Sequence, residues 1–590
     1  MIRGEFIDKF LNWRKRKIPD RPFILVMSVI VGFLVGSTAV IIKNLVHFMQ
    51  ELVRKGLTFD GYNIFLLILP IIGVLATVIF TRYILKRNVG HGIPSVLYAI
   101  SKTNGRIKPH NMFSSIISSA LTVGFGGSVG LEGPTVATGA AIGSNVGRYL
   151  KLSYKQILTM LGCASAGAMS AIFKAPIAGT IFALEVIMLN LTMSSLIPLL
   201  ISSVTAALTS YLFLGQNVLY NFTLAEGFSI SDTPFYLFLG LFTGLASVYF
   251  TRMYIFVSSK FEKVDGWGNR LLAGGLLLGV MIFLVPSLYG EGYSGINNAL
   301  NGNYEYLFQD SLYFGLKDNF IVLIGVLVFL IIFKVVATSV TFSSGGVGGV
   351  FAPTLFMGAH AGLLFAVVIN RFGFDLEISN FVLVAMAGMI AGVIHAPLTA
   401  IFLIAEITGG YALLMPLMIT ATISYLVTRI FVNNSVYTYQ LAKRGELITH
   451  NKDKAALTLM DVGSMIETNF NTIHPDATLG ELVEVISHSV RNVFPVVDKH
   501  KNFLGVVWVN DIRHIVFKPE LYEDTYVRDL MFMPSPTVSP GESMEDVAYK
   551  FQTSSHYNLP VIDNGHYIGF VSRANVFSEY RSMIKNFMEE

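Results

Sequence analysis

One stretch of this sequence occurs twice, first as Gly126-Gly-Ser-Val-Gly-Leu-Glu-Gly-Pro-Thr135 and again as Gly345-Gly-Val-Gly-Gly-Val-Phe-Ala-Pro-Thr354. The second copy begins 219 residues after the first. Further matches follow in the same order at an offset of 221 residues: Lys174-Ala-Pro-Ile177 with His395-Ala-Pro-Leu398, and Glu185 with Glu406. Ordered matches at a nearly constant spacing indicate a duplicated domain, which is common in membrane transporters.

The composition around these copies is that of a membrane protein. Hydrophobic residues make up 53% of the 590 positions and charged residues only 14%, whereas soluble domains carry about 25% charge. Several apolar stretches approach or exceed the roughly 20 residues of a membrane-spanning helix. They are Phe23–Val40, Ile64–Phe80, Phe235–Tyr249, Ile321–Val340 (interrupted only by Lys334) and Phe381–Ile407. We predict an α-helical polytopic membrane protein built from two related halves, which in transporters are often inverted relative to each other.

The domain boundaries follow from changes in composition. Residues 1–20 form a polar segment, and its Arg14-Lys-Arg-Lys17 cluster beside the first span predicts a cytosolic N-terminus. Residues 21–445 form the membrane domain, with repeat halves at about 21–215 and 232–445. After Leu441-Ala-Lys-Arg444 the chain becomes charged and alternates strand-like with helix-like patterns. Residues 455–520 and 521–590 are therefore expected to be two soluble α+β modules, also cytosolic.

The repeated motifs have the chemistry of an anion site. Helix N-termini present free N–H groups with partial positive charge, and they stabilise an anion without trapping it as a full cation would. Glycine permits close approach to the backbone, and proline is tolerated in the first helical turn. Two such N-termini from duplicated halves would face each other across the ion. Glu132 lies inside the first motif with no cation near it in sequence, so its carboxylate could compete with the transported anion or carry a proton.

These motifs also carry a family resemblance. Gly90-His-Gly-Ile-Pro94, Gly130-Leu-Glu-Gly-Pro134 and Ser344-Gly-Gly-Val-Gly-Gly-Val-Phe-Ala-Pro353 occur in that order, followed by Tyr437. In this respect the membrane domain resembles the CLC family of chloride channels and proton/chloride exchangers. The resemblance implies a multi-pass protein of the plasma membrane and a homodimer with one anion path in each subunit. It also implies an inverted-repeat fold, and chloride as the transported ion.

The resemblance assigns a role to each motif residue. Glu132 becomes the gating and proton-carrying residue. The anion-binding positions are His91, Leu131, Gly133, Val350, Phe351 and Tyr437. All except His91 and Tyr437 would act through the backbone, and Tyr437 would offer its hydroxyl group.

Three departures from the family pattern affect the mechanism. His91 replaces the usual serine, which bears on selectivity and on pH response because histidine can titrate near neutral pH. Leu131 replaces a common arginine. Val186 stands where many proton-coupled members carry a second, internal glutamate, and valine holds no proton. We therefore expect a passive channel gated by voltage or pH, with a proton-coupled chloride exchanger that uses Glu132 as the alternative.

The C-terminal modules resemble a tandem pair of CBS domains. The motifs are Phe494-Pro-Val-Val-Asp498 and Leu559-Pro-Val-Ile-Asp563. An adenine nucleotide in their cleft would contact Asp511, Ser572 and Asn575, although neither module keeps the full Ser/Thr-x-x-Asp pattern. A structural tail without nucleotide is the other interpretation.

Other function classes fit the sequence poorly. A net charge of +4 does not suggest nucleic-acid binding. No paired carboxylates or nucleophile constellation indicate an enzyme, and His91, His360 and His395 are not spaced as metal ligands. A cation transporter would need several carboxylates or carbonyls in its pore, but the motifs supply only Glu132. We expect no catalytic residue, no metal and no required cofactor.

Overall fold

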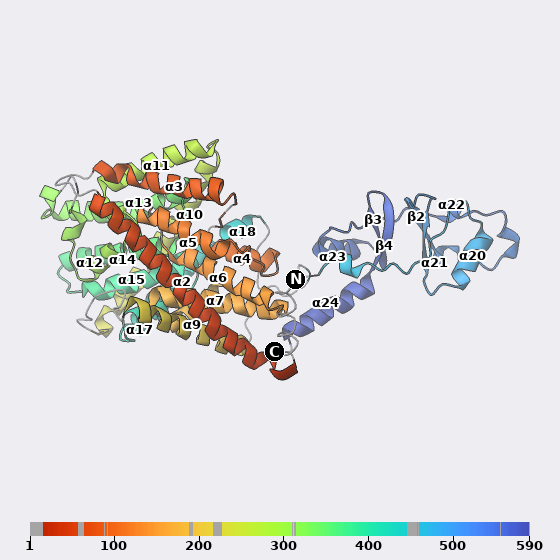
Figure 1. The fold of residues 1–590 in the computed structure, drawn as a ribbon, viewed down its shortest axis with the longest axis horizontal. Helices are drawn as coiled ribbons and strands as arrows, with labels where there is room; N and C mark the ends of the chain where they lie inside the picture. Colours follow the sequence, from red (N-terminus) through yellow and green to blue (C-terminus); the bar gives the residue numbers. More distant parts are fainter. Residues whose placement is uncertain are drawn as a thin grey trace, which may run out of the picture. The chain divides into compact units, whose positions relative to one another are not determined.

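Apolar helices of very different lengths build the first part of the chain (Figure 1). The computed structural model describes residues 14, 16–56, 64–87, 89–90, 92–187, 193–215, 227–309, 311, 314–444, 457, 460–554 and 556–588. The chain divides into two compact units, Met1–Leu447 and Ile448–Glu590. Within the described residues, nine helices are long and apolar enough to cross a membrane. The predicted polytopic helical fold is therefore confirmed for the first unit.

In the first half of the membrane unit the described residues form eight α-helices. They are α2 (Asp20–Gly56), α3 (Leu69–Ile79), α4 (Ile93–Lys102), α5 (Asn111–Gly124), α6 (Glu132–Tyr149), α7 (Tyr154–Phe173), α8 (Pro176–Phe182) and α9 (Met193–Leu214). Short single-turn helices accompany them: η1 (Ile64–Leu67), η2 (Phe80–Ile84) and η3 (Ala183–Ile187).

The second half repeats this series. Its helices are α10 (Thr233–Glu262), α11 (Trp267–Leu284), α12 (Tyr293–Leu300), α13 (Phe320–Ser343), α14 (Phe351–Arg371), α15 (Ile378–Ile394), α16 (Pro397–Ile407), α17 (Leu414–Phe431) and α18 (Tyr439–Lys443). The short elements are η4 (Ile230–Asp232), η5 (Pro286–Leu288), η6 (Glu305–Leu307) and η7 (Phe314–Leu316).

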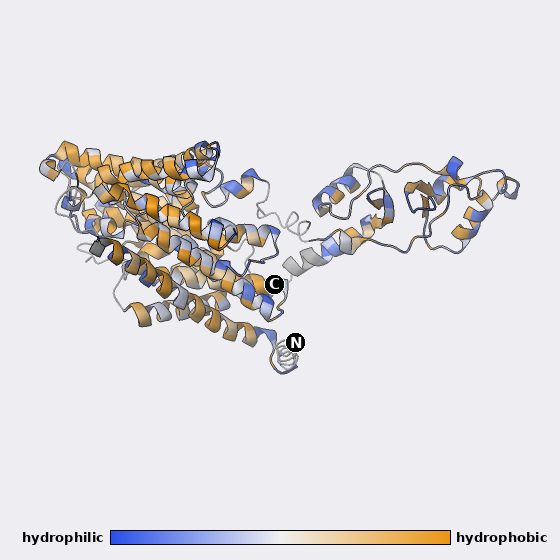
Figure 2. Cartoon of the chain, turned by 45° about the horizontal axis from the view of Figure 1, so that its top comes forward, coloured by the Kyte–Doolittle hydropathy of each residue, from blue (hydrophilic) through white to orange (hydrophobic). Residues whose placement is uncertain are grey.

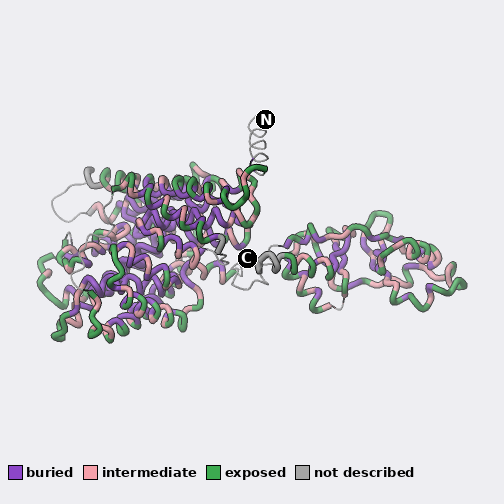
Figure 3. The backbone as a smooth tube through the Cα atoms, turned by 90° about the horizontal axis from the view of Figure 1, so that it is seen from below, coloured by how far each residue is buried: buried purple, intermediate pink, exposed green. Residues whose placement is uncertain are grey.

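The packing of the two halves confirms the internal repeat. In the first half α2 packs on α7 and α9, and α7 packs on α6 and α9. In the second half α10 packs on α15 and α17, and α15 packs on α14 and α17 in the same way. The central helices α7 and α15 are buried along most of their length, while the outer helices expose apolar side chains (Figures 2 and 3). Such surfaces suit contact with lipid.

The two halves also cap each other's helices. The Glu185 carboxylate accepts hydrogen bonds from the backbone N–H groups of Leu398 (3.1 Å) and Thr399 (2.8 Å) at the start of α16. The Glu406 carboxylate accepts the equivalent bonds from Ile177 (3.0 Å) and Ala178 (2.7 Å) at the start of α8. Carboxylates satisfy the free N–H groups and the partial positive charge of a helix N-terminus. This exchange explains why both glutamates recur in the repeat.

One predicted span is wrong. The apolar run Phe381–Ile407 is not a single helix but two, α15 and α16, because His395 adopts a left-handed backbone conformation (φ 62°) and Pro397 opens the next helix. Lys174 (φ 57°) ends α7 in the same way, just before α8. Proline disfavours helical continuation through the residues before it, so the repeated Ala-Pro pairs mark these breaks.

Replacing Glu185 with alanine should destabilise the membrane unit. The change leaves two backbone N–H groups and the Thr399 hydroxyl without their acceptor, so we expect a loss of about 2–3 kcal/mol in the free energy of unfolding. Thermal unfolding of the detergent-purified protein measures it, and Glu406→Ala is the matched variant from the other half. Unchanged stability with altered transport would instead make Glu185 a transport residue.

The second unit contains two small antiparallel hairpins, β1 (Val493–Val497) with β2 (Phe503–Trp508), and β3 (Asn558–Asp563) with β4 (His566–Ser572). The helices are α20 (Leu479–Ser487), α21 (Val509–Ile512), α22 (Val527–Leu530), α23 (Met544–Thr553) and α24 (Arg573–Met588), with single turns η8 (Gly463–Met465) and η9 (Pro519–Leu521). Each hairpin with its helices is an α+β module, as predicted.

The two modules exchange their leading segments. Glu467, which precedes the first module's hairpin, pairs with Phe570 in β4, and Phe532, which precedes the second, pairs with Val506 in β2. Met460, Val462 and Met465 belong accordingly to the core of the second module. The modules therefore form one interlocked unit, which the spacing of the two sequence motifs did not reveal.

Candidate functional site

Two helix N-termini meet at the repeated glycine motifs. Helix α6 begins at Glu132 and helix α14 at Phe351, with proline in the first turn of each. Gly130 donates its N–H to the Gly349 carbonyl (2.8 Å), and Gly349 donates to the Gly130 carbonyl (2.7 Å), in an antiparallel pair. The motifs therefore meet as the repeat suggested, with their partial positive ends brought together from opposite halves.

A third N-terminus joins them. Helix α4 follows Gly92, whose φ of 59° favours glycine, and a Cβ atom on Gly92 would lie 3.1 Å from the Gly133 Cα atom. The backbone before α4 thus lies directly against the first turn of α6. His91 lies outside the described residues, so its predicted contact with the anion stays a prediction.

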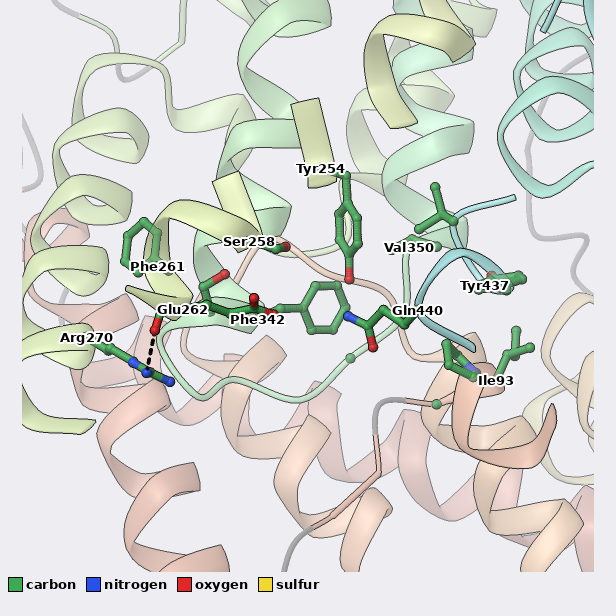
Figure 4. Close-up of a pocket in the computed structure, with 17 residues that line it drawn as sticks. Ile93, Tyr254, Ser258, Phe261, Glu262, Arg270, Phe342, Val350, Tyr437 and Gln440 are labelled. Carbon is green, nitrogen blue, oxygen red and sulfur yellow. Dashed lines mark hydrogen bonds between the residues drawn. The ribbon is translucent and has the colours of Figure 1, made fainter. Parts of the chain in front are cut away.

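A cavity of about 240 Å³ opens where these three N-termini converge (Figure 4). Ile93, Gly133 and Val350 line it at the helix ends, together with Tyr437. Polar side chains farther along its wall are Tyr254, Ser258, Glu262, Arg270 and Gln440. The volume is large enough for several water molecules or a hydrated anion.

Tyr437 has the properties of an unused hydrogen-bond donor. Its side chain is 4% exposed, and its hydroxyl has no hydrogen-bond partner in the described part of the chain. Buried hydroxyl groups are nearly always satisfied in folded proteins, so an unpaired one on a cavity wall points to a ligand. A phenol can donate one hydrogen bond to an anion.

Glu132 is fully buried at the start of α6. Its Oε1 atom accepts a hydrogen bond from the Tyr293 hydroxyl. Its Oε2 atom has no hydrogen-bond partner among the described residues, although the amides of Glu132 itself and Ala352 lie close enough to stabilise its charge. A Cβ atom on Gly130 would come within 2.1 Å of Oε2, so glycine is needed there to seat this carboxylate.

The structure also surrounds Glu132 with charges that the sequence placed far away. Lys43 in α2 interacts electrostatically with Glu132, and Glu291 interacts with both of them and with Lys334 in α13. Lys334 is fully buried and donates to the Gly290 carbonyl (3.1 Å). In the sequence, Lys334 stands out as the only charge in an apolar run. No sequence pattern connects Glu132 with Tyr293, Glu291 or Lys43.

The remaining predicted anion contacts differ in their surroundings. The Leu131 N–H donates to Glu291 Oε1 (3.2 Å), so it is occupied by a carboxylate of the protein in this conformation. Phe351 is buried with its ring 5.2 Å from that of Phe173. Val350, the residue before it, reaches the cavity.

The predicted inner proton position, Val186, has no available carboxylate in its own turn, η3, all of which the structure describes. Val186 is half-buried in η3, and the neighbouring Glu185 carboxylate is used to cap α16. Among the cavity-lining residues the single carboxylate is Glu262, at the end of α10.

The candidate nucleotide residues lie in different modules of the tail. Ser572, at the end of β4, donates to Glu467 Oε1 (2.6 Å) and accepts from the Asn575 N–H (3.1 Å). The Arg491 guanidinium forms an ion pair with the other Glu467 oxygen, with 2.9 Å between Nη2 and Oε2. Asp511 is exposed in α21. Ser572 and Asn575 are therefore close together, with the Ser572 hydroxyl already engaged.

Comparisons with known proteins agree with this architecture. Residues 72–429 match the family model for the voltage gated chloride channel, and residues 462–518 and 527–582 each match the CBS domain. A protein named putative chloride channel protein ClcB-like, from Ralstonia nicotianae, is 30% identical over 387 residues, which are 64% of this chain and 85% of that protein. A protein named H(+)/Cl(-) exchange transporter ClcA, from Vibrio parahaemolyticus, is 27% identical over 440 residues, or 71% and 90%.

Solved structures share the fold. A slow cyanobacterial Cl−/H+ antiporter superposes with a TM-score of 0.60 at 21% identity, covering 72% of this chain and 99% of that one. A eukaryotic CLC transporter gives a TM-score of 0.57 at 18% identity, covering 93% and 98%. The chain therefore belongs to the voltage-gated chloride channel family, the CLC proteins, and carries a pair of CBS domains after its membrane unit.

Proposed function

We propose that this protein exchanges chloride, or a similar small anion, for protons across a lipid bilayer, with Glu132 closing the anion path and carrying the proton. The observation that supports this most is the buried Glu132 carboxylate between two opposed helix N-termini, held by a single side-chain hydrogen bond from Tyr293. Several relatives bear the name H(+)/Cl(-) exchange transporter, which favours exchange over our first expectation of a passive channel.

The electrostatics support a competition between the carboxylate and the anion. An ionised Glu132 acts as an internal anion for the amides at the start of α6 and α14. Taking up a proton removes that charge, so the side chain loses its attraction to the helix ends and an anion can take its place. Return of the carboxylate then expels the anion and releases the proton.

The inner half of the proton path must work without a glutamate at Val186. The cavity that reaches Gly133, the residue after Glu132, is large enough to hold water instead. Water chains relay protons between side chains, and Glu262 is a carboxylate on the same cavity wall. Exchange therefore remains chemically possible with valine at position 186.

A passive anion channel is the second candidate, and Val186 is the observation that favours it. With Glu185 engaged at α16, η3 offers no free carboxylate for an inbound proton. Such a channel would still use Glu132 as a gate, opened by voltage or by acid.

Reconstitution into liposomes distinguishes the two candidates. An outward chloride gradient is imposed on vesicles that contain a pH-sensitive dye. We expect the gradient to drive protons uphill, in the direction opposite to chloride. Chloride efflux without proton movement would replace exchange by a channel, and the absence of any anion flux would remove the proposed function altogether.

The Tyr437→Phe variant tests the anion site. We expect anion affinity to fall about tenfold, because the anion loses one hydrogen bond to a charged partner, while thermal stability without chloride stays equal or rises. Isothermal titration with chloride and thermal unfolding measure the two effects. Equal chloride affinity in both proteins would show that the hydroxyl does not bind the ion.

The other features of the proposal stay predictions, the domain boundaries and cytosolic termini from composition and charge, and the rest from the family resemblance. They are assembly as a homodimer, residence in the plasma membrane with both termini cytosolic, voltage dependence, and domain boundaries at residues 21–445, 455–520 and 521–590. Binding of an adenine nucleotide near Asp511, Ser572 and Asn575 belongs with them.

A further inference from the structure

A short loop connects the gate to a second carboxylate. Gly290-Glu-Gly-Tyr293 follows η5 and ends at Tyr293, the first residue of α12. Tyr293 donates its hydroxyl hydrogen to Glu132, and Glu291, two residues earlier, accepts the N–H of Leu131 at 3.2 Å. Leu131 directly precedes Glu132 at the start of α6. One loop therefore contacts both the side chain of the gate and the backbone that carries it.

The charges around Glu291 come from separate elements. Glu132 on α6, Lys43 on α2 and Lys334 on α13 each interact electrostatically with it. Lys43 donates to the Ile172 carbonyl (2.7 Å) and interacts electrostatically with Lys174. Lys334 donates to the Leu288 and Gly290 carbonyls at 3.4 and 3.1 Å. His360 interacts electrostatically with Lys334, and its ring nitrogens form hydrogen bonds with the Tyr306 hydroxyl and the Phe356 carbonyl.

These groups form a balanced set when all are ionised. Two carboxylates, Glu132 and Glu291, face two ammonium groups, Lys43 and Lys334, so their charges sum to zero. Protonation of Glu132 leaves one net positive charge, which attracts an anion to the helix N-termini. Glu291 therefore acts on the gate in two ways: its charge disfavours a second charge on Glu132, and it limits the positive charge offered to the anion.

We propose that Glu291 is a positioning residue of the gate. Its negative charge sets the pH at which Glu132 takes up its proton. The same charge sets the affinity of the site for the anion that replaces the Glu132 carboxylate. This inference rests on the proposed function. It does not require Glu291 to leave its hydrogen bond with Leu131 or to carry a proton across the membrane.

The Glu291→Gln variant tests the inference in liposomes. Removing the negative charge favours the ionised form of Glu132, so the midpoint of acid-activated chloride flux should move by about one pH unit toward acid. The half-saturating chloride concentration should fall as the local charge becomes more positive. Lys43→Met should shift both quantities in the opposite directions, which a merely structural disturbance would not do.

Two further variants guard the result. Glu291→Asp keeps the charge and should keep the wild-type midpoint, and it remains informative if the glutamine variant folds poorly. Glu305→Gln removes an exposed carboxylate that pairs with Lys317 and should leave the profile unchanged. Identical midpoints in wild type, Glu291→Gln and Lys43→Met would overturn the inference. The proposed function is tested separately by Glu132→Gln. Shifts of Glu291→Gln and Lys43→Met in the same direction would also overturn it.

Discussion

Replacing Glu132 with glutamine should abolish proton transport and leave anion transport intact. Glutamine has nearly the same shape but neither ionises nor carries a proton, so it cannot compete with the anion for the N-termini of α6 and α14. Proton movement driven by a chloride gradient should fall to the level of empty liposomes. Chloride flux should persist and lose its dependence on pH between about 4 and 8, the range over which carboxylates and histidines titrate.

The matched control is Glu406→Gln, which alters another carboxylate at a helix N-terminus, that of α8. It should lower stability and leave the ratio of chloride to protons unchanged. A Glu132→Gln protein that still pumps protons would show that another group carries them. One that conducts chloride with the wild-type pH profile would remove Glu132 from the gate.

The Tyr293→Phe variant should open the anion path at neutral pH. The hydroxyl of Tyr293 is the side-chain donor that holds Glu132, and hydrogen bonds to charged groups contribute about 1.5–3 kcal/mol. Because about 1.4 kcal/mol corresponds to a factor of ten, we expect chloride flux at pH 7 to rise roughly 10- to 100-fold. The loss of this donor also favours the protonated, displaced form of Glu132, so both effects act in the same direction.

Tyr306→Phe is the control for this variant. Tyr306 also carries a buried hydroxyl, which bonds to His360 instead of Glu132. It should alter stability without raising flux at neutral pH. If Tyr293→Phe leaves the flux unchanged while Glu132→Gln raises it, the carboxylate is held by the backbone amides of α6 and α14 instead of by the phenol.

The local features of the site were predictable because they depend on short-range chemistry. Glycine four residues before proline, in Gly130–Pro134 and Gly349–Pro353, predicts helix N-termini that a ligand can approach, and α6 and α14 begin inside these motifs. Duplication of the motifs predicted that the N-termini of α6 and α14 lie close together. The antiparallel backbone pair of Gly130 and Gly349 joins them. The recurring glutamates likewise find equivalent partners in the two halves.

Other features were beyond local reasoning. The break at His395 was missed because apolar composition hides it, and only the left-handed backbone reveals where α15 ends. The exchange of leading segments in the tail was missed because strand pairing between distant residues leaves no periodic signal. For the mechanism, Val186 favoured a channel, whereas several relatives bear the name H(+)/Cl(-) exchange transporter, and the liposome experiment distinguishes the two.

The duplicated glycine motifs alone predict a two-half membrane fold and the places where α6 and α14 begin, and they single out Glu132 as the carboxylate beside the proposed anion path. Tertiary structure decides which groups act on that carboxylate. Lys43 lies on α2 and Lys334 on α13, while Glu291 lies in the loop before α12 and Tyr293 is the first residue of that helix. Of the four, only Lys334 stands out in the sequence, as a charge in an apolar run. Electrostatic interactions depend on distance and burial in three dimensions, so the charge balance at the gate exists only once these helices pack together.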